Sequence, residues 1–316
     1  MNYPYAIGNI KAIESRIFDK NKFSKLIRVE KNDFLKTLKE LGYASSVNSD
    51  HLEDYIQAEL VALKQYFDEI SPDKHLTDLF FMANDATNIK IMFKKRIFGL
   101  DQIDVYAQTG SIQPELLETA ILNHDYSLLS KDIQALLLGI EKQIDGLSNA
   151  RLISSIIDNA IYDFIFSQIG FSQARALRRY FQAVIDTTNV MSWLRCRLLE
   201  WDINEFEVMF INHGLIPKTV FWESFTMSEE TSPRAFMEYY DEQIMKALKT
   251  YFEKPELNQI ERLFDLLVLE LMKEERNESF SIGPIIYYYL QKISEAKNIR
   301  MIYASTYFNP SDLLDY

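Results

Sequence analysis

Apolar residues recur along most of this chain at the three- and four-residue spacing that places them on one face of an α-helix. One such stripe consists of Leu52, Tyr55, Ile56, Leu60, Leu63, Tyr66 and Phe67. The strict alternation of a half-buried β-strand is hard to find anywhere. We therefore predict an all-α fold with helices over residues 6–18, 31–42, 51–70, 75–98, 113–122, 132–143, 150–168, 172–199, 204–213, 233–252, 256–274 and 281–305.

Turn residues are scarce in this chain. It has 9 glycines and 8 prolines among 316 residues, below the usual share of about 7% and 5%. They cluster where helices should end, as at residues 110–114 and 214–217, and no low-complexity linker separates parts of the chain. We expect long helices packed into a compact or ring-like body.

Composition narrows the class of protein. Apolar residues make up 47% and charged residues 25% of the chain, which is typical of a soluble globular protein long enough for two or three units. The net charge of −12 argues against nucleic-acid binding. The start lacks a secretion signal, and no apolar run is long enough to cross a bilayer, so we expect any membrane association to be peripheral. The single cysteine, Cys196, excludes an internal disulfide and is expected to be a buried, inert thiol.

One polar phrase occurs three times. NDATNIKIMFKKRIFGLD, at residues 84–101, returns as IDTTNVMSWLRCRLLEWD at residues 185–202, and a third copy lies near the end of the chain. Each copy has an asparagine with an acidic residue three positions earlier: Asp85 and Asn88, Asp186 and Asn189, Glu295 and Asn298. Three similar helical units are the simplest account, and we divide them as residues 1–105, 106–206 and 207–316.

The repeated pair has a physical consequence on a helix. Positions three apart share a helix face, so each copy sets a carboxylate beside a carboxamide. Apolar residues one and four positions after each asparagine indicate that this face is buried. Buried polar groups need hydrogen-bonding partners. We interpret the pairs as polar groups that join one helix of each unit to the next; direct ligand binding is the alternative.

The sequence contains none of the usual catalytic or metal-binding patterns. A magnesium-dependent prenyl-diphosphate enzyme would need aspartate-rich clusters on facing helices, but Asp85 stands alone and Met92 occupies the position of the later carboxylate. The usual phosphate-binding and zinc-binding motifs are missing, and the four histidines lack metal-ligand spacing. We predict no catalytic residue, no cofactor and no metal, and keep the prenyl-diphosphate enzyme as a remote alternative.

Basic residues crowd the same repeated segments. They are Lys90, Lys94, Lys95 and Arg96 in the first copy, Arg195 and Arg197 in the second, and Arg300 in the third. On an otherwise acidic chain they could form an interface with a partner. The alternative is that they are exposed basic residues at helix ends, where the helix dipole favours them.

Several stretches together carry a family resemblance: YPYAIGNIKAIESRI at residues 3–17, DATNIK at 85–90, DTTN at 186–189 and NIR at 298–300. They resemble the C subunit of the central stalk of bacterial and archaeal V-type (A-type) rotary ATPases, whose eukaryotic counterpart is the d subunit. The resemblance extends over essentially the whole chain. The second copy departs from the family pattern, because Val190 and Met191 replace isoleucine and lysine.

The resemblance implies a non-catalytic protein in which three similar helical bundles surround a pseudo-threefold axis and form a funnel. In the family this funnel lies on the cytoplasmic side of the membrane as a peripheral component. It sits on the membrane rotor ring and receives the end of the central shaft, so that ATP hydrolysis on other subunits is coupled to H⁺ or Na⁺ transport. The choice of ion belongs to the ring. A helical scaffold that binds another partner in a central hollow is the alternative.

Overall fold

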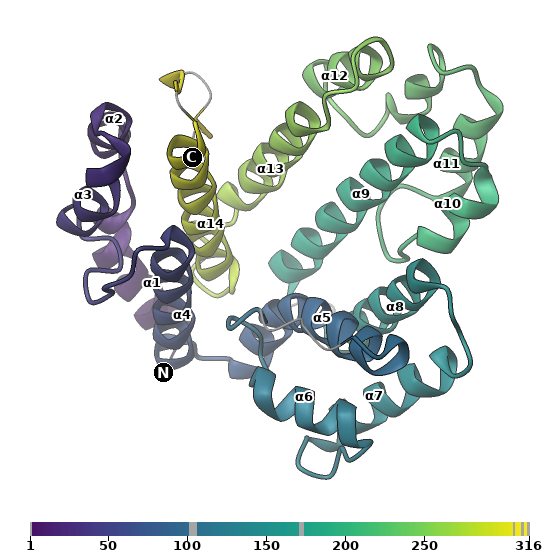
Figure 1. Cartoon of the computed structure of the whole chain (residues 1–316), viewed down its shortest axis with the longest axis horizontal. Helices are drawn as coiled ribbons and strands as arrows, with labels where there is room; N and C mark the ends of the chain where they lie inside the picture. Colours follow the sequence, from purple (N-terminus) through teal and green to yellow (C-terminus); the bar gives the residue numbers. More distant parts are fainter. Residues whose placement is uncertain (1, 101–105, 171–173, 306, 311–312, 315–316) are drawn as a thin grey trace. The chain divides into compact units, whose positions relative to one another are not determined.

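Figure 1 shows the fold, a computed structural model that describes residues 2–100, 106–170, 174–305, 307–310 and 313–314. All regular elements in these ranges are helical, which confirms the predicted all-α class. The α-helices are α1 (Tyr3–Ile13), α2 (Lys20–Arg28), α3 (Phe34–Glu40), α4 (Leu52–Ile70), α5 (Lys74–Phe98), α6 (Pro114–Asn123), α7 (Lys131–Ile144), α8 (Ala150–Gln168), α9 (Arg175–Leu198), α10 (Ile203–Met209), α11 (Lys218–Thr226), α12 (Glu242–Glu253), α13 (Leu257–Lys273) and α14 (Gly283–Ala304). Short 3-10 helices are η1 (Glu14–Arg16), η2 (Lys31–Asp33) and η3 (Ser232–Phe236).

The helices form two compact units. Unit 1 consists of Met1–Thr77, Gln173–Leu177 and Asp265–Tyr316. Unit 2 consists of Asp78–Ser172 and Arg178–Phe264. Both ends of the chain therefore belong to unit 1, in which α14 packs with the N-terminal helices.

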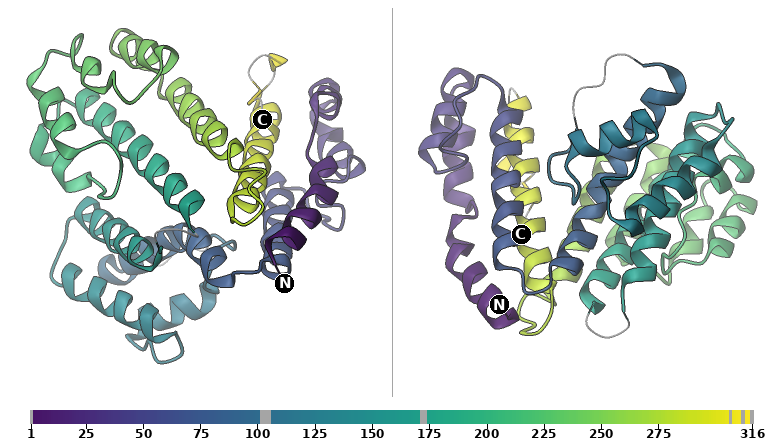
Figure 2. Two further views of the ribbon diagram at one scale, coloured as in Figure 1. Left: turned by 180° about the vertical axis from the view of Figure 1, so that it is seen from behind. Right: turned by 90° about the horizontal axis from the view of Figure 1, so that it is seen from below.

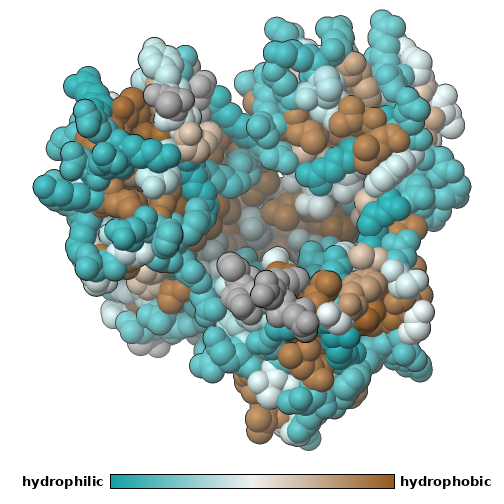
Figure 3. Space-filling view, viewed as in Figure 1, coloured by the Kyte–Doolittle hydropathy of each residue, from teal (hydrophilic) through white to brown (hydrophobic). Residues whose placement is uncertain are grey.

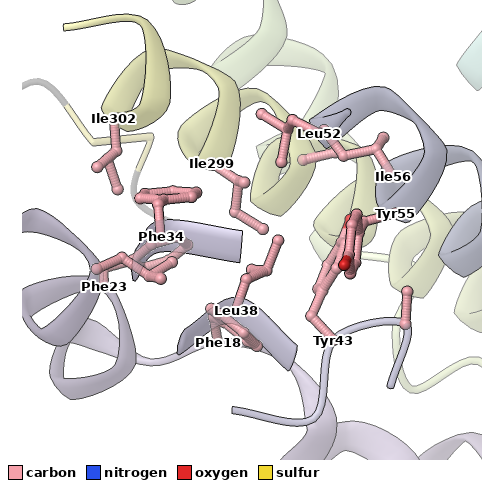
Figure 4. Packing of buried hydrophobic residues seen from close by; sticks show 13 residues of the cluster. Phe18, Phe23, Phe34, Leu38, Tyr43, Leu52, Tyr55, Ile56, Ile299 and Ile302 are labelled. Atoms are coloured by element: carbon pink, nitrogen blue, oxygen red, sulfur yellow. The ribbon is translucent and has the colours of Figure 1, made fainter. Parts of the chain in front are cut away.

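In unit 1, α14 packs against α1, α2 and α4, and Figures 1 and 2 show α4 and α14 side by side. Figure 4 shows the apolar cluster to which α2, α3, α4 and α14 contribute. Its buried members are Phe18, Phe23, Leu26, Phe34, Leu38, Tyr43, Ala44, Leu52, Tyr55, Ile56, Ala296, Ile299 and Ile302. Residues from both ends of the chain thus share one core.

In unit 2, α7 packs on α8, α8 packs on α10, and η3 lies between α11 and α12. Aromatic rings fill the interior of the α9–α12 part. The ring of the fully buried Trp193 lies 4.8 Å from that of Phe236 and 5.8 Å from that of Phe252, centre to centre. Phe206 stacks on Phe221 with ring centres 5.1 Å apart. These edge-to-face and stacked contacts stabilise the core beyond the effect of the apolar area that the rings bury.

Several predicted elements are confirmed closely. The stripe predicted on residues 51–70 lies on α4, whose residues Leu52, Tyr55, Ile56, Leu63 and Phe67 are buried. The starts of many helices follow from capping chemistry, because a short polar side chain accepts N–H groups of the first turn. Ser130, Asn149 and Asp202 do this for α7, α8 and α10.

Other helix predictions were wrong. The helices α2 and α11 were not predicted, because each has only nine residues and shows little more than two turns of periodicity. The predicted helix 233–252 begins only at Glu242. Asp241 has extended backbone, and its side chain accepts the N–H of Ile244, which starts a new helix there.

The predicted helix 6–18 ends at Ile13, and η1 follows. The backbone is extended at Ile17, and the N–H of Phe18 donates to a side chain of α14 instead of continuing the helix. The helix predicted from 172 to 199 spans Arg175–Leu198, and residues 172 and 173 lie outside the described residues. The boundary expected after residue 105 also borders undescribed residues, so the division into thirds stays a prediction.

Two further expectations concern burial. Cys196 is buried, as predicted, and burial raises the pKa of its thiol to about 12, which makes the reactive thiolate rare at neutral pH. Over the part of the chain that the structure describes, none of the helices combines the length and apolar character needed to span a bilayer.

Candidate functional site

The repeated pairs lie on three long helices. Asp85 and Asn88 are on α5, Asp186 and Asn189 on α9, and Glu295 and Asn298 on α14. All six side chains are buried, and the most exposed, Asp186, is only 7% exposed. Groups this polar are costly to bury unless hydrogen bonds replace those lost to water.

The three asparagines bind backbone in the same way. Each side-chain amide donates to the carbonyl oxygen of one residue and accepts the N–H of that same residue, so that two hydrogen bonds close a ring. We call this arrangement the amide clip. The clipped residues are Ala107 for Asn88 (2.9 and 2.8 Å), Ile211 for Asn189 (2.8 and 2.9 Å) and Leu314 for Asn298 (3.0 and 2.8 Å).

The two aspartates hold the next part of the same loops. The Asp85 carboxylate accepts the N–H groups of Ser111 (2.7 Å) and Ile112 (3.2 Å), as well as the Ser111 hydroxyl (2.6 Å). The Asp186 carboxylate accepts the N–H groups of Leu215 and Ile216, both at 3.0 Å. In both copies these residues follow the clipped residue by four and five positions, so each loop is bound at two points in the same register.

A glycine precedes the bound N–H groups in both loops. A Cβ built on Gly110 would come within 3.0 Å of the Asp85 Oδ1 atom, and one built on Gly214 equally close to the Asp186 Oδ1 atom. Real Cβ atoms essentially never come that close. Neither glycine has a positive φ, so close approach to the carboxylate, and not backbone strain, requires glycine here.

In the third copy the corresponding loop is divided between the two ends of the chain. Asn298 clips Leu314 near the C-terminus, while the Glu295 carboxylate accepts the N–H of Phe18, near the N-terminus, at 2.6 Å. Phe18 precedes the cap of α2 by one residue, as Ile112 and Ile216 precede the residues that cap α6 and α11. The third copy is therefore completed by α2, from the other end of the chain.

The third copy also contains an ammonium group. Lys292 is only 2% exposed and forms an ion pair with Glu295. Its Nζ atom also lies 2.8 Å from the Oε1 atom of Glu59 on α4. The other Glu59 oxygen accepts the N–H of Ala44 at 3.0 Å. A glutamate replaces the aspartate of the other copies, and its charge is balanced by a buried cation.

Burial perturbs these carboxyl groups. It raises the pKa of Asp186 to about 6, although the N–H groups of Ile216 and Leu215 oppose the shift by stabilising the charged form. Burial also raises the pKa of Glu295, against the stabilising charge of Lys292 and the N–H of Phe18.

Most of the basic residues named from the sequence bind other parts of the chain. Lys90 pairs with Asp158 (2.7 Å), Lys95 with Glu118 (2.9 Å), Arg96 with Glu141 (2.7 Å), Arg195 with Glu261 (3.4 Å) and Arg300 with Glu53 (2.7 Å). Burial, followed by the nearby Lys90 ammonium, lowers the pKa of Lys94. An additional role of these residues at a partner interface stays a prediction.

Two of the arginines share a task that the sequence did not suggest. Arg96 and Arg197 each lie eight positions after the motif asparagine. Arg96 donates to the carbonyl oxygen of Ile121 in the last turn of α6 (2.6 Å), and Arg197 donates to that of Met227 at the end of α11 (3.2 Å). Both neutralise the negative end of the helix that begins after the bound loop, α6 for Arg96 and α11 for Arg197. Their common register in the repeat was the signal available in the sequence.

The arrangement is suited to holding loops rather than to chemistry. The motif carboxylates and amides are committed to backbone groups of the same chain. Within the described residues, there is no group of three or more His, Cys, Asp or Glu side chains that could hold a metal ion. The site thus fixes three loops against three long helices.

Comparison with known proteins gives a consistent result. The chain is 22% identical to the C subunit of the A-type ATP synthase of Haloquadratum walsbyi, over 95% of this chain and 93% of the relative. It is 22% identical to the C subunit of the V-type sodium ATPase of Enterococcus hirae, over 93% and 90%. It is 21% identical to the C subunit of the A-type ATP synthase of Methanosarcina barkeri, over 99% and 91%.

A family model described as "ATP synthase (C/AC39) subunit" matches residues 6–315. This range includes all three pairs and both loops bound in unit 2, as well as the N-terminal segment that completes the third copy. The chain belongs to the ATP synthase (C/AC39) subunit family, and it is a subunit of a rotary ATPase rather than an enzyme by itself.

Proposed function

We propose that this chain is the non-catalytic rotor subunit that couples the central shaft of a rotary ATPase to its membrane ring. In this role it is a socket, and ATP hydrolysis on other subunits drives, or is driven by, transport of H⁺ or Na⁺ through the membrane part. The observation that supports this most directly is the family match over residues 6–315. The relatives include both A-type synthases and a V-type sodium ATPase, so both ions and both directions stay within the proposal.

The internal architecture supports a mechanical role. A part that transmits torque must deform little under load, and closely packed helices are stiff. Loops are ordinarily the weakest parts of a helical protein. Here the amide clips and the buried carboxylates tie the loops that precede α6 and α11 to α5 and α9. These hydrogen bonds are shielded from water, and this shielding strengthens them.

We further propose that three similar units surround a pseudo-threefold axis and form a funnel. The shared hydrogen-bonding pattern of the three motif helices supports three equivalent units. It also suggests where they begin: at α5, at α9 and at α14, with the third unit completed by α2–α4. These limits differ from a simple division of the sequence into thirds.

The expected partners are the central shaft subunits and the membrane rotor ring, with the chain attached peripherally on the cytoplasmic side. Lys90, Lys94, Lys95, Arg96, Arg195, Arg197 and Arg300 are proposed as possible contacts. The ion pairs of Arg195 and Arg300 are about half-exposed, and pairs of this kind cost little to exchange for an intermolecular acidic partner. The ion pairs of Lys90, Lys95 and Arg96 are more deeply buried.

Co-purification tests this function. A tagged copy of the chain should retain a membrane ring and a coiled-coil shaft subunit after detergent extraction, and its removal should leave ATP hydrolysis active but uncoupled from ion transport. Recovery of neither component, with transport unaffected, would instead favour a helical scaffold for another partner. Magnesium-dependent release of diphosphate by the purified chain, abolished by Asp85→Ala, would favour a prenyl-diphosphate enzyme; we expect none.

A further inference from the structure

A strongly basic segment lies at α2 and α3 of this acidic chain. Between Lys20 and Glu40 seven side chains are basic and three are acidic. The structurally corresponding segments of the other two copies have the opposite balance. Residues 114–144, which contain α6 and α7, carry two basic and five acidic side chains, and residues 218–253, with α11 and α12, carry four and seven. The basic character is therefore particular to the third copy.

The basic side chains of this segment point away from the core. Phe23 and Leu26 of α2, and Phe34 and Leu38 of α3, are buried in the apolar cluster. The opposite faces carry Lys25 and Arg28 on α2, and Lys36 and Lys39 on α3, at i and i+3 spacing. Figure 3 shows mainly hydrophilic side chains over the outer surface of these helices.

Four of these cations have no acidic partner among the described residues. Lys25, Arg28 and Lys36 are exposed and Lys39 is half-buried, and none of the four forms an ion pair there. By contrast, the basic residues of the motif helices mostly have acidic partners in the chain. Unpaired positive charges repel one another within the patch, but the rest of this acidic protein does not repel them. Such a patch attracts negatively charged partners.

A pocket of about 350 Å³ with several apolar residues in its lining adjoins this surface within unit 1. Its lining includes Leu26 and Ile27 of α2, Phe34 of α3, and Ile302 and Tyr303 of α14. Figure 4 shows Phe34 and Ile302 next to each other. Lys31 also lines the pocket, and its ammonium lies 4.9 Å from the centre of the Tyr303 ring. The lining thus combines an apolar wall with one carboxylate, Glu30, and one ammonium, Lys31, and the volume suits one large side chain.

We propose that the surface formed by Lys25, Arg28, Lys31, Lys36 and Lys39, together with this pocket, binds an acidic segment of a protein partner that inserts one apolar side chain. Complementary charge would attract and orient the segment, and the inserted side chain would supply the buried contact on which affinity mainly depends. This inference depends on the charge and shape of unit 1 and not on the rotor function proposed above.

A protein segment fits these observations better than an anionic bilayer. A helix that lies on a membrane directs its apolar face into the lipid. The apolar residues of α2 and α3 face the protein core instead, and the segment from Lys20 to Glu40 contains none of the exposed large apolar side chains found among the described residues. A pocket beside the charges also favours a ligand with a projecting side chain.

Binding of labelled peptides to the full chain tests the proposal. The probe is a fluorescent peptide with one phenylalanine flanked by glutamates, and its control has alanine at the phenylalanine position. The double variant Lys25→Glu/Arg28→Glu should weaken binding of the probe by about tenfold or more. Lys246→Glu/Lys249→Glu makes the same charge change on exposed i and i+3 positions of α12 and should alter binding less than about twofold.

The pocket is tested separately by Ala304→Trp. Ala304 is exposed and lines the pocket, so the indole should fill it and remove the advantage of the phenylalanine peptide over its alanine control. Circular dichroism should show unchanged folding for every variant. Equal losses in the two charge variants, no difference between the peptides, or binding to phosphatidylglycerol vesicles but to neither peptide would each overturn the proposal.

Discussion

The closeness of Gly214 to the buried Asp186 carboxylate leads to a quantitative prediction. In the variant Gly214→Ala, the new Cβ would lie within 3.0 Å of Asp186 Oδ1, so either the carboxylate or the loop must move. Either movement breaks the two hydrogen bonds from Leu215 and Ile216, both 3.0 Å long. Hydrogen bonds to a charged group contribute about 1.5–3 kcal/mol each, so we expect a loss of about 3 kcal/mol after partial relaxation.

Tryptophan fluorescence can isolate this effect. The three tryptophans, Trp193, Trp201 and Trp222, all belong to unit 2, so a urea titration followed by their emission reports the unfolding of the unit that contains the substitution. With a slope of about 2 kcal/mol per molar urea, a loss of about 3 kcal/mol lowers the midpoint by about 1.5 M. The titration should be run near pH 8, where Asp186 is ionised in spite of its raised pKa of about 6.

A double-mutant cycle identifies the cause. In an Asp186→Ala background the carboxylate is absent, and the new Cβ at position 214 meets Ile185 Cγ2 at 3.2 Å, so the same glycine substitution should cost less than about 1 kcal/mol. Gly139→Ala is the matched control. Gly139 lies inside α7 with nothing within 4 Å of an added Cβ, and its substitution should stabilise by about 0.5–1 kcal/mol. An equal penalty for Gly214→Ala with and without the carboxylate would refute the reasoning.

Three further measurements examine the buried polar groups. Asn189→Ala leaves the N–H and the carbonyl of Ile211 without their partner, so amide exchange at Ile211 should accelerate by about 100-fold, and an unchanged rate would contradict the amide clip. Burial raises the pKa of Asp186 to about 6, so its protonated form stabilises the fold below about pH 4. This contribution is lost as the pH rises to about 6, and the stability of the parent chain relative to Asp186→Asn should fall by up to about 3 kcal/mol over that range in urea titrations. Lys292→Met leaves Glu295 buried without its ammonium partner, which should destabilise unit 1 by about 3 kcal/mol at pH 8. The loss should become smaller as the pH falls, because burial raises the pKa of Glu295 and protonation removes the unpaired charge; a loss in the exchange rates of α14 that is independent of pH would exclude this explanation.

Periodicity was a good guide where packing and local preference agree. Long helices such as α4, α8 and α13 have a continuous apolar stripe that several turns repeat, so their existence and limits were predicted within a few residues. The short helices α2 and α11 could not be found in this way. These short segments are helical because their few apolar residues pack into the core. In elements of this length, tertiary packing outweighs local helix preference.

The candidate site was only half visible in the sequence. The spacing of Asp85 and Asn88 and of their counterparts indicated a buried polar face, and the repetition of that spacing indicated a common task. The groups that these side chains bind were not visible, because backbone N–H and carbonyl groups leave no mark in a sequence. The sequence places glycines at positions 110 and 214, where helices are expected to end, but the reason for glycine, the closeness of a carboxylate, requires coordinates.

The sequence by itself determined the helical class, the threefold repetition of a carboxylate and an amide, and the family, because each depends on residue type and spacing along the chain. Only the tertiary structure decided which backbone groups satisfy those polar side chains and which basic residues are already paired. It also brought Phe18 to Glu295, across 277 residues. The physical reason is that a buried polar side chain must form hydrogen bonds, and its burial can be predicted from the local sequence. Which distant groups become its partners is determined by the fold.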